Sequence, residues 1–358
     1  MQFAAPLRHC IAFLIFPLAL QAQQVRSLVP VEPYAAILDA FRTHQVVALS
    51  AGSSHEDARG HDFVVSLVEH PRFAAVVTDI VVEGTNSRFQ SVIDRYADGA
   101  AVPDAEMRHI WDDTTQQQIP GPIWAGEIPA LFHRVRAINA SRNAERRVRI
   151  LLGDPPIDWA GVKTAADFQP WLAQRDTFPA EMLRREVIAR GRRALVLFGG
   201  GHFQRRQQAT NYEMDAPAAK TLVSLVEASG TRVFVVRTAG DSQTPASGFG
   251  IDSLPTPSLA AVKGTALGAS NEPASSMPRI RIRDGRPVPV PLDEYVAVPL
   301  QEQLDAVLYL GPASEARVRP VPRTICADST YVQVRLQRMR TVGLPTPVIE
   351  QLRRLCGV

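Results

Sequence analysis

The chain has 358 residues, of which 46% are hydrophobic, enough for one large domain or two modest ones. Its 39 basic residues nearly balance its 36 acidic residues, and no basic run is interleaved with aromatic residues. This distribution argues against nucleic-acid binding.

The first residues have the composition of a signal peptide. Arg8 and His9 precede an apolar stretch at residues 10–20, which suits a secretory h-region and is too short for a membrane span. Ala22 supplies the small residue at which a signal peptidase cuts. We therefore expect residues 1–22 to be removed and the protein to be exported, to the periplasm or outside the cell. No other segment predicts a membrane span.

Two glycine-rich tetrads each follow a predicted buried strand. Gly52-Ser53-Ser54-His55 follows the apolar run 46–49, and Gly199-Gly200-Gly201-His202 follows the run 194–198. Glycine lets the backbone turn sharply after a strand, which places each histidine near the start of the next helix. In an open α/β sheet, ligands bind beyond the carboxyl ends of the strands. The alternative is that both histidines only cap helices.

Two more predicted strands also end in polar residues. Residues 75–82 lead directly into Glu83, and residues 148–152 lead into Gly153-Asp154. Asn86 and Arg88 come shortly after Glu83. The four strand ends therefore present His55, Glu83, Asp154 and His202.

The remaining pattern alternates helices with strands. Expected helices cover residues 31–42, 57–67, 88–96, 128–139, 178–190 and 218–228, with further strands at 232–236 and 307–310 and closing helices at 331–339 and 348–355. Residues 100–143 exceed a simple crossover, which predicts a helical insertion that covers the site as a lid. The composition of residues 241–299 indicates an irregular segment rich in proline, serine and glycine.

This alternation predicts an α/β fold: a mainly parallel open sheet flanked by helices, with the insertion over the carboxyl edge of the strands. The sheet strands are expected near residues 46, 76, 148, 194, 232 and 307. Residues 23–240 would form the main α/β domain, and residues 300–358 would complete it.

Two cysteines, Cys326 and Cys356, remain after removal of the leader. An even pair in an exported protein predicts a disulfide, here one that ties the last helix back to the chain. In the chain-entropy model such a loop contributes roughly 3 kcal/mol.

The strand-end residues suggest acid–base chemistry. Histidine titrates near neutral pH and is also the commonest metal ligand, and a nearby glutamate orients an imidazole or takes a proton. We expect His55, Glu83 and His202 to act as catalytic residues, with His55 as general base. The alternative is that the same three residues bind a divalent metal, although a metal site needs at least three converging ligands. Expected substrate-binding residues are Arg88, Asn86, Asp154, Gly200 and Gly201, and a private ion pair between Arg88 and Glu83 is the competing hypothesis for Arg88.

Two familiar enzyme motifs are missing. The chain has no Gly-x-Ser-x-Gly pentapeptide of a serine hydrolase. Gln204 also breaks the dinucleotide fingerprint that Gly199-Gly200-Gly201 would begin.

The tetrads at Gly52–His55 and Gly199–His202, with Glu83 between them, resemble the superfamily that unites erythromycin esterases, ChaN-like haem-uptake proteins, TraB-type proteins and Tiki proteases. An exported, uncharacterised bacterial group within it is similar over most of residues 31–345, including Asp79–Glu83 and Gly153–Trp159. The resemblance implies an α/β fold with a polar pocket at the strand ends.

One departure concerns the first strand, because the family often has Gly-Glu where this chain has Ser50-Ala51. Glu56, Asp57 or Glu83 would have to substitute for that carboxylate, or hydrolysis is weakened or lost. The leading hypothesis is a metal-independent hydrolase of an ester or amide, using histidine-activated water. The alternatives are a protein that binds haem or another small ligand without turnover, and a metal-dependent peptidase.

Overall fold

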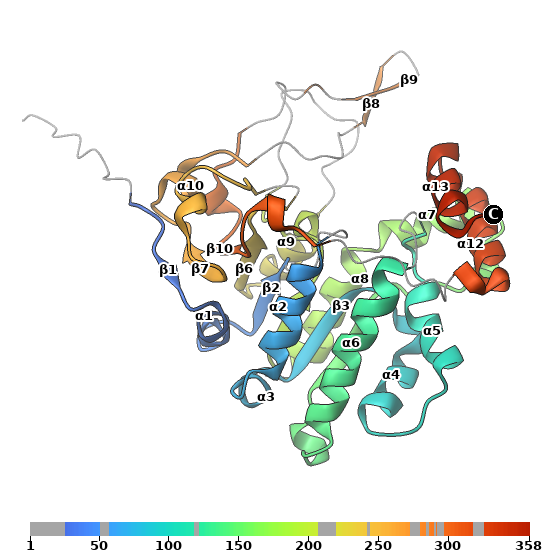
Figure 1. Ribbon diagram of the computed structural model, residues 1–358, viewed down its shortest axis with the longest axis horizontal. Helices are drawn as coiled ribbons and strands as arrows, with labels where there is room; N and C mark the ends of the chain where they lie inside the picture. Colours follow the sequence, from blue (N-terminus) through green and yellow to red (C-terminus); the bar gives the residue numbers. More distant parts are fainter. Residues whose placement is uncertain are drawn as a thin grey trace, which may run out of the picture.

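The computed structural model describes residues 26–50, 57–117, 122–206, 220–241, 244–272, 280–283, 286–289, 291, 297–317 and 326–358. In these residues an eight-stranded sheet has the order β1-β7-β10-β6-β2-β5-β3-β4, with helices on both faces (Figure 1). The predicted α/β class is confirmed, including the mostly parallel sheet.

The parallel strands of the sheet are β2 (Val46–Leu49), β3 (Asp79–Asn86), β4 (Arg149–Asp154), β5 (Ala194–Leu197), β6 (Val233–Thr238) and β10 (Ala306–Tyr309). All six strands expected from the sequence are present in the one sheet. Leu49 of β2 lies opposite Leu197 of β5, so the ends that precede the two tetrads are neighbours. Outside this sheet, β8 (Ile280–Arg283) and β9 (Arg286–Pro289) pair with each other in antiparallel fashion.

The helices include α1 (Pro33–Ala40), α2 (Ala58–Glu69), α3 (Phe73–Val76), α4 (Gln90–Ala97), α5 (Asp104–Asp112), α6 (Pro122–Asn139), α7 (Ala165–Ala173), α8 (Thr177–Met182), α9 (Leu222–Glu227), α10 (Ala266–Ala269), α12 (Ser329–Thr341) and α13 (Thr346–Cys356). Expected helix 178–190 is divided, because α8 continues into a π-helix at Leu183–Ile188. Among the described helices, none has the length and apolar character needed to cross a membrane.

Three described strands lie in the segment expected to be irregular, residues 241–299: β8, β9 and a strand of the main sheet. β7 (Ser258–Ala261) pairs antiparallel with both β10 and β1 (Pro30–Val31). The strand has only four residues, too few to show a hydrophobic alternation, and Pro255 and Pro257 directly precede it. The sheet therefore continues beyond the parallel strands through an antiparallel edge.

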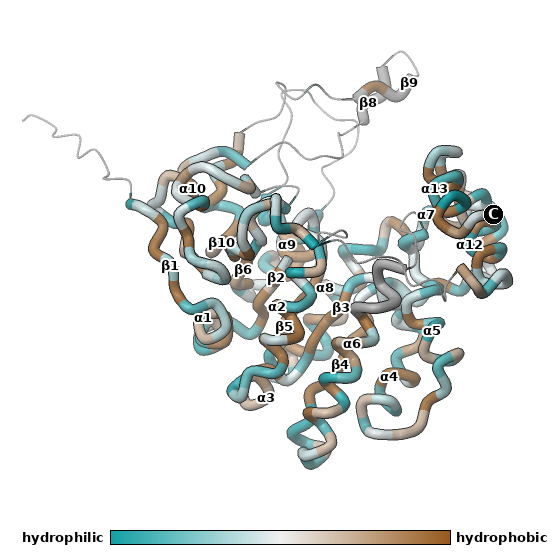
Figure 2. The backbone as a smooth tube through the Cα atoms, in the orientation of Figure 1, coloured by the Kyte–Doolittle hydropathy of each residue, from teal (hydrophilic) through white to brown (hydrophobic). Residues whose placement is uncertain are grey.

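Alternate residues of each strand face two different hydrophobic clusters. In β2, Val47 and Leu49 belong to the cluster under α2, α4, α5 and α6, whereas Val46 and Ala48 belong to the cluster under α8 and α9. Apolar strands accordingly run through the centre of the molecule and polar helix faces lie outside (Figure 2). Burial on both faces explains why the strands are continuous apolar runs.

Side-chain amides cover the outer edge of β4. Gln90 accepts a hydrogen bond from the N–H of Leu152 at 2.9 Å and donates one to the carbonyl of Ile150 at 2.7 Å. Asn139 makes the equivalent pair with the N–H and carbonyl of Val148, both at 2.9 Å. These bonds satisfy backbone groups that an edge strand would otherwise offer to another chain.

The predicted insertion reaches the carboxyl edge of the sheet through a short turn. Helices α5 and α6 contribute Met107, Phe132 and their neighbours to the hydrophobic cluster on one face of the sheet. The turn after α5, residues 113–117, extends beyond the carboxyl ends of β3 and β4, where it contacts Glu83 and Asp154.

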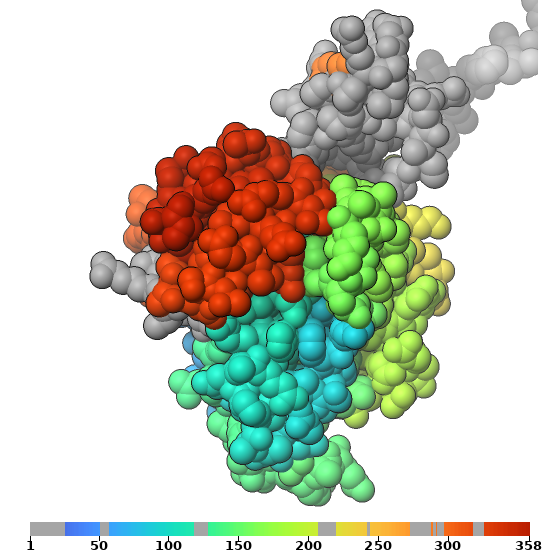
Figure 3. All heavy atoms as spheres, turned by 90° about the vertical axis from the view of Figure 1, so that its right-hand side faces the viewer, coloured from blue at the N-terminus to red at the C-terminus, as the bar shows by residue number. Residues whose placement is uncertain are grey.

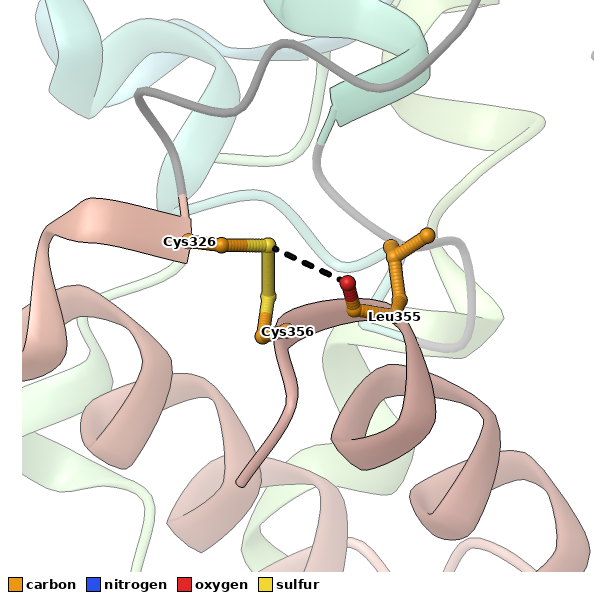
Figure 4. The surroundings of a disulfide bond; sticks show 3 residues. All are labelled: Cys326, Leu355 and Cys356. Carbon is orange, nitrogen blue, oxygen red and sulfur yellow. Dashed lines mark hydrogen bonds between the residues drawn. A yellow bond between two sulfur atoms is a disulfide. The ribbon is translucent and has the colours of Figure 1, made fainter.

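The predicted pairing of Cys326 with Cys356 is present, with Cα atoms 4.8 Å apart (Figure 4). The pair joins Cys326, three residues before α12, to the last residue of α13, so the two helices form a closed hairpin. Figure 3 shows this hairpin beside the elements near residue 110 and beside α7.

A buried ionic cluster at the amino end of β3 is expected to stabilise the sheet. Asp79 is fully buried and accepts hydrogen bonds from Nε of Arg149 at 2.6 Å and from Nε of Arg192 at 2.7 Å. We expect Asp79→Ala to lower the free energy of unfolding by about 3 kcal/mol, because it leaves two guanidinium groups without their carboxylate. Urea denaturation measures this loss.

The matched control is Asp39→Ala, which removes the exposed partner of Arg72. Exposed ion pairs contribute little, so its unfolding midpoint should stay close to that of the wild type. Equal losses in the two variants would contradict the assignment of the Asp79 cluster.

Candidate functional site

The site begins where β3 and β5 end side by side. Val82 lies opposite Leu197, and the register of β3 against β4 shifts after Val82. Gly84 has φ +70°, a left-handed conformation that favours glycine. This irregularity turns the end of β3 so that Glu83 lies beside the glycines that follow β5.

Glu83 is 4% exposed, and its carboxylate is held from three segments of the chain. Oε2 accepts a hydrogen bond from the N–H of Gly199 at 2.6 Å. Oε1 accepts one from Nε2 of Gln116 at 2.9 Å and an ion-pair hydrogen bond from Nη2 of Arg175. A carboxylate this buried is stable because its charge is paired and its oxygens are bonded.

His202 lies between two carboxylates. Its Nδ1 is 2.7 Å from Oδ1 of Asp176, and its Nε2 is 3.4 Å from Oε1 of Glu83. The same Asp176 oxygen accepts a hydrogen bond from the N–H of Leu222, the first residue of α9, at 2.7 Å. The imidazole side chain is 16% exposed, so solvent reaches part of it.

These neighbours set the charge of His202. Burial by itself lowers the pKa of His202, but the charges and hydrogen bonds of Asp176 and Glu83 outweigh it and raise the pKa to about 9. The imidazole is therefore a cation at neutral pH. It donates through both nitrogens and cannot accept a proton.

Asp154 supports the site from behind. It is 1% exposed, and it accepts hydrogen bonds from the N–H of Gly84 at 3.1 Å and from Oγ1 of Thr115 at 3.0 Å. Gly84 and Thr115 are the chain neighbours of Glu83 and Gln116. Burial raises the pKa of Asp154, against the opposing charge of Arg175. Asp154 thus fixes the backbone on both sides of the Glu83–Gln116 contact.

Of the other residues expected at the site, some are buried and hold the backbone nearby, and others are partly exposed to solvent. Asn86 is fully buried and donates to the carbonyls of Asp113 at 2.8 Å and Ile157 at 2.9 Å. Arg88 pairs with Asp158 at 3.0 Å, with half of its side chain exposed, and the cation on Glu83 is Arg175 instead. Gly200 and Gly201 open the short 3-10 helix Gly200–Phe203 that carries His202.

The first tetrad, with His55, lies outside the described residues, as do Ala51 and Glu56. Of the carboxylates considered as substitutes at this strand end, Asp57 caps α2 and binds the guanidinium of Arg59 at 2.6 Å. Ser50 at the end of β2 donates to Asp241 at 2.9 Å. The structure thus joins Glu83 and His202 and leaves the place of His55 undescribed.

Sequence patterns missed Gln116, Arg175 and Asp176. Gln116 lies in the insertion, and the two charged residues lie in the three-residue linker between α7 and α8. A charged dipeptide between two helices is an ordinary solvent-exposed linker by pattern alone. Its adjacency to β3 and β5 arises only from the packing of α8 on the sheet.

As arranged, Glu83 and His202 do not fit a divalent cation or a haem iron. The guanidinium of Arg175 occupies Oε1 of Glu83 and lies 3.4 Å from Nε2 of His202, where it would repel a metal ion. Within the described part of the chain, no cluster of three or more candidate ligands occurs.

Comparison with known proteins gives only weak structural similarity. No protein-family model matches the chain, and no curated protein matches it. A crystal structure of a Bacillus cereus protein has a TM-score of 0.48 at 11% identity, covering 83% of this chain and 97% of that one. The type III effector HopBA1 has a TM-score of 0.36 at 12% identity, covering 80% and 97%. A structure of bacterial protein toxins has a TM-score of 0.36 at 15% identity over 58% of this chain, which spans 36% of that chain.

The charge of His202 is open to direct titration. We expect its imidazole resonances to titrate with a pKa near 9, and Asp176→Asn to lower that pKa, because the amide keeps an oxygen for Leu222 but removes the charge. Nitrogen-15 NMR of the histidine side chains measures both values. A wild-type pKa near 6.5, unchanged in Asp176→Asn, would contradict the assignment.

The same shift predicts how stability depends on pH. The folded-state pKa lies above the unfolded value, so the contribution of His202 is fully present below about pH 6.5 and is lost as pH rises through about 9. A shift of this size corresponds to about 3 kcal/mol. In Asp176→Asn this component of the pH dependence should shrink.

Proposed function

We propose that the protein is an exported hydrolase of an ester or amide bond. The observation that carries the proposal is the position of the His202 imidazole between the carboxylates of Asp176 and Glu83, at the carboxyl edge of the sheet. A preorganised cation in a partly enclosed site stabilises negative charge that develops in a transition state. His202 is one of the three catalytic residues expected from the sequence.

Protonated His202 leaves the general base to His55. In the proposed reaction His55 removes a proton from water, and the water oxygen forms a bond to the carbonyl carbon. The resulting oxyanion is stabilised by the positive charges of His202 and Arg175. When the tetrahedral intermediate collapses, the bond to the leaving oxygen or nitrogen breaks and that atom takes the proton from His55.

Glu83 has a positioning role in this proposal. Its Oε2 accepts a hydrogen bond from the N–H of Gly199, and its Oε1 accepts hydrogen bonds from Gln116 and Arg175. The same Oε1 faces Nε2 of His202. It therefore fixes the loop after β5 and keeps His202 charged. The resemblance in the paired tetrads supports the same assignment of Glu83 and the two histidines.

Export is part of the proposal. The leader expected at residues 1–22 lies outside the described residues, and the Cys326–Cys356 pair accords with an oxidising compartment. The periplasm and the extracellular space meet this condition equally.

Ligand binding without turnover is the competing function, favoured by Ser50-Ala51 in place of the family's Gly-Glu. Haemin titration separates it from hydrolysis. A Soret shift in the wild type, lost in His55→Ala or His202→Ala, would favour haem binding. Metal analysis of the purified protein tests the peptidase alternative.

The activity prediction uses a panel of chromogenic esters and amides. We expect His202→Gln to lower kcat/KM roughly 10²–10³-fold, because it removes a preorganised charged donor. The control is His70→Gln, which should retain wild-type activity. His70 is the residue that caps the carboxyl end of α2.

Asp176→Asn provides a sharper test through the pH profile. Since His202 then loses its proton at lower pH, activity should be near the wild type at pH 6 and fall at pH 8. Activity of Asp176→Asn that parallels the wild type at every pH would contradict a catalytic imidazolium at His202.

A further inference from the structure

The C-terminal hairpin, α12 and α13, is docked largely by arginines. Arg335 is 2% exposed, and its Nη2 donates to the carbonyl of Gln116 at 3.0 Å and to that of Gln117 at 3.3 Å. Arg338 pairs with Asp113 at 2.6 Å and lies over the ring of Trp159 at 4.8 Å. Both arginines thus bind the turn of residues 113–117.

This turn delivers a side chain to the candidate site. Gln116, whose carbonyl binds Arg335, donates its amide to Oε1 of Glu83 at 2.9 Å. Thr115 donates to Asp154. A continuous series of hydrogen bonds therefore runs from α12 through Gln116 to the carboxylate that faces His202.

The hairpin has little hydrophobic core of its own. Its fully buried apolar residues are Val332, Leu336, Met339 and Leu352. Such a small cluster seldom orders two helices in water without a covalent or ionic link. The Cys326–Cys356 pair closes the two free ends of this hairpin, opposite the turn at Gly343.

We propose that the C-terminal hairpin is a positioning element for the candidate site, with Arg335 acting through Gln116 on Glu83 and the Cys326–Cys356 disulfide holding Arg335 in place. The relevance of Glu83 to catalysis rests on the proposed hydrolase function. The mechanical link does not, because it is made by contacts of the folded protein alone.

The first test reads the pKa of His202 in the full-length oxidised protein. Without the amide donor, the Glu83 carboxylate is less fixed and stabilises the imidazolium less. Arg335→Lys, whose single ammonium replaces a forked guanidinium, and Gln116→Leu should each lower the His202 pKa by about 0.5 unit or more. Arg340→Lys, an exposed arginine of the same helix, is the matched control and should leave it unchanged.

The double variant Arg335→Lys/Gln116→Leu distinguishes positioning from a general loss of structure. If Arg335 acts through Gln116, the double variant should shift the pKa no further than Gln116→Leu does. Additive shifts, or no shift in either single variant, would overturn the proposal. Should Arg335→Lys fail to fold, Gln116→Leu and the disulfide variant carry the test.

The second test removes the disulfide with Cys326→Ser/Cys356→Ser. We expect the His202 pKa to fall in the same direction, and kcat on the best ester or amide to fall more than KM rises. A protein without hydrolase activity that still shows the linked pKa shifts would refute the proposed function and support this inference. An active hydrolase whose His202 pKa is unchanged in all three variants would support the proposed function and refute this inference.

Discussion

The buried carboxylate of Glu83 is the constraint on which the site depends. A charge at 4% exposure is unstable unless donors surround it, and the donors here come from Gly199, Gln116 and Arg175. Each belongs to a different connection of the sheet. The hydrogen bonds to this one carboxylate therefore fix the loop after β5, the turn after α5 and the linker between α7 and α8 in a single arrangement.

Charge balance explains why the arrangement can be both stable and reactive. Glu83 and Asp176 supply two negative charges, and Arg175 and protonated His202 supply two positive charges. In a poorly hydrated environment each ion holds its neighbour in the charged form. In the proposed reaction, the imidazolium that results stabilises negative charge on the substrate without reorganising.

Hydrogen bonds also connect the site to the C-terminal hairpin. Asp154 holds Gly84 and Thr115, and α12 holds the backbone of Gln116 from the other side. The turn at residues 113–117 is thus tied to the sheet at one end and to the C-terminal hairpin at the other. A disulfide far from β3 along the chain then bears on the geometry of Glu83, through hydrogen bonds rather than through contact with the site.

The sequence by itself determined the class of fold, six strands of the sheet, the Cys326–Cys356 pair and the candidates Glu83 and His202, which the structure brings together. Each of these follows from local pattern: apolar runs of strand length, glycines after strands, and polar residues at strand ends. β7 was not predicted, because it has only four residues and two prolines directly precede it. Arg175, Asp176 and Gln116, and the exposed pairing of Arg88 with Asp158, were decided only by tertiary structure. Those contacts join residues 26 to 92 positions apart in the chain. No local pattern records which helix linker the packing of α7 and α8 brings to the edge of the sheet.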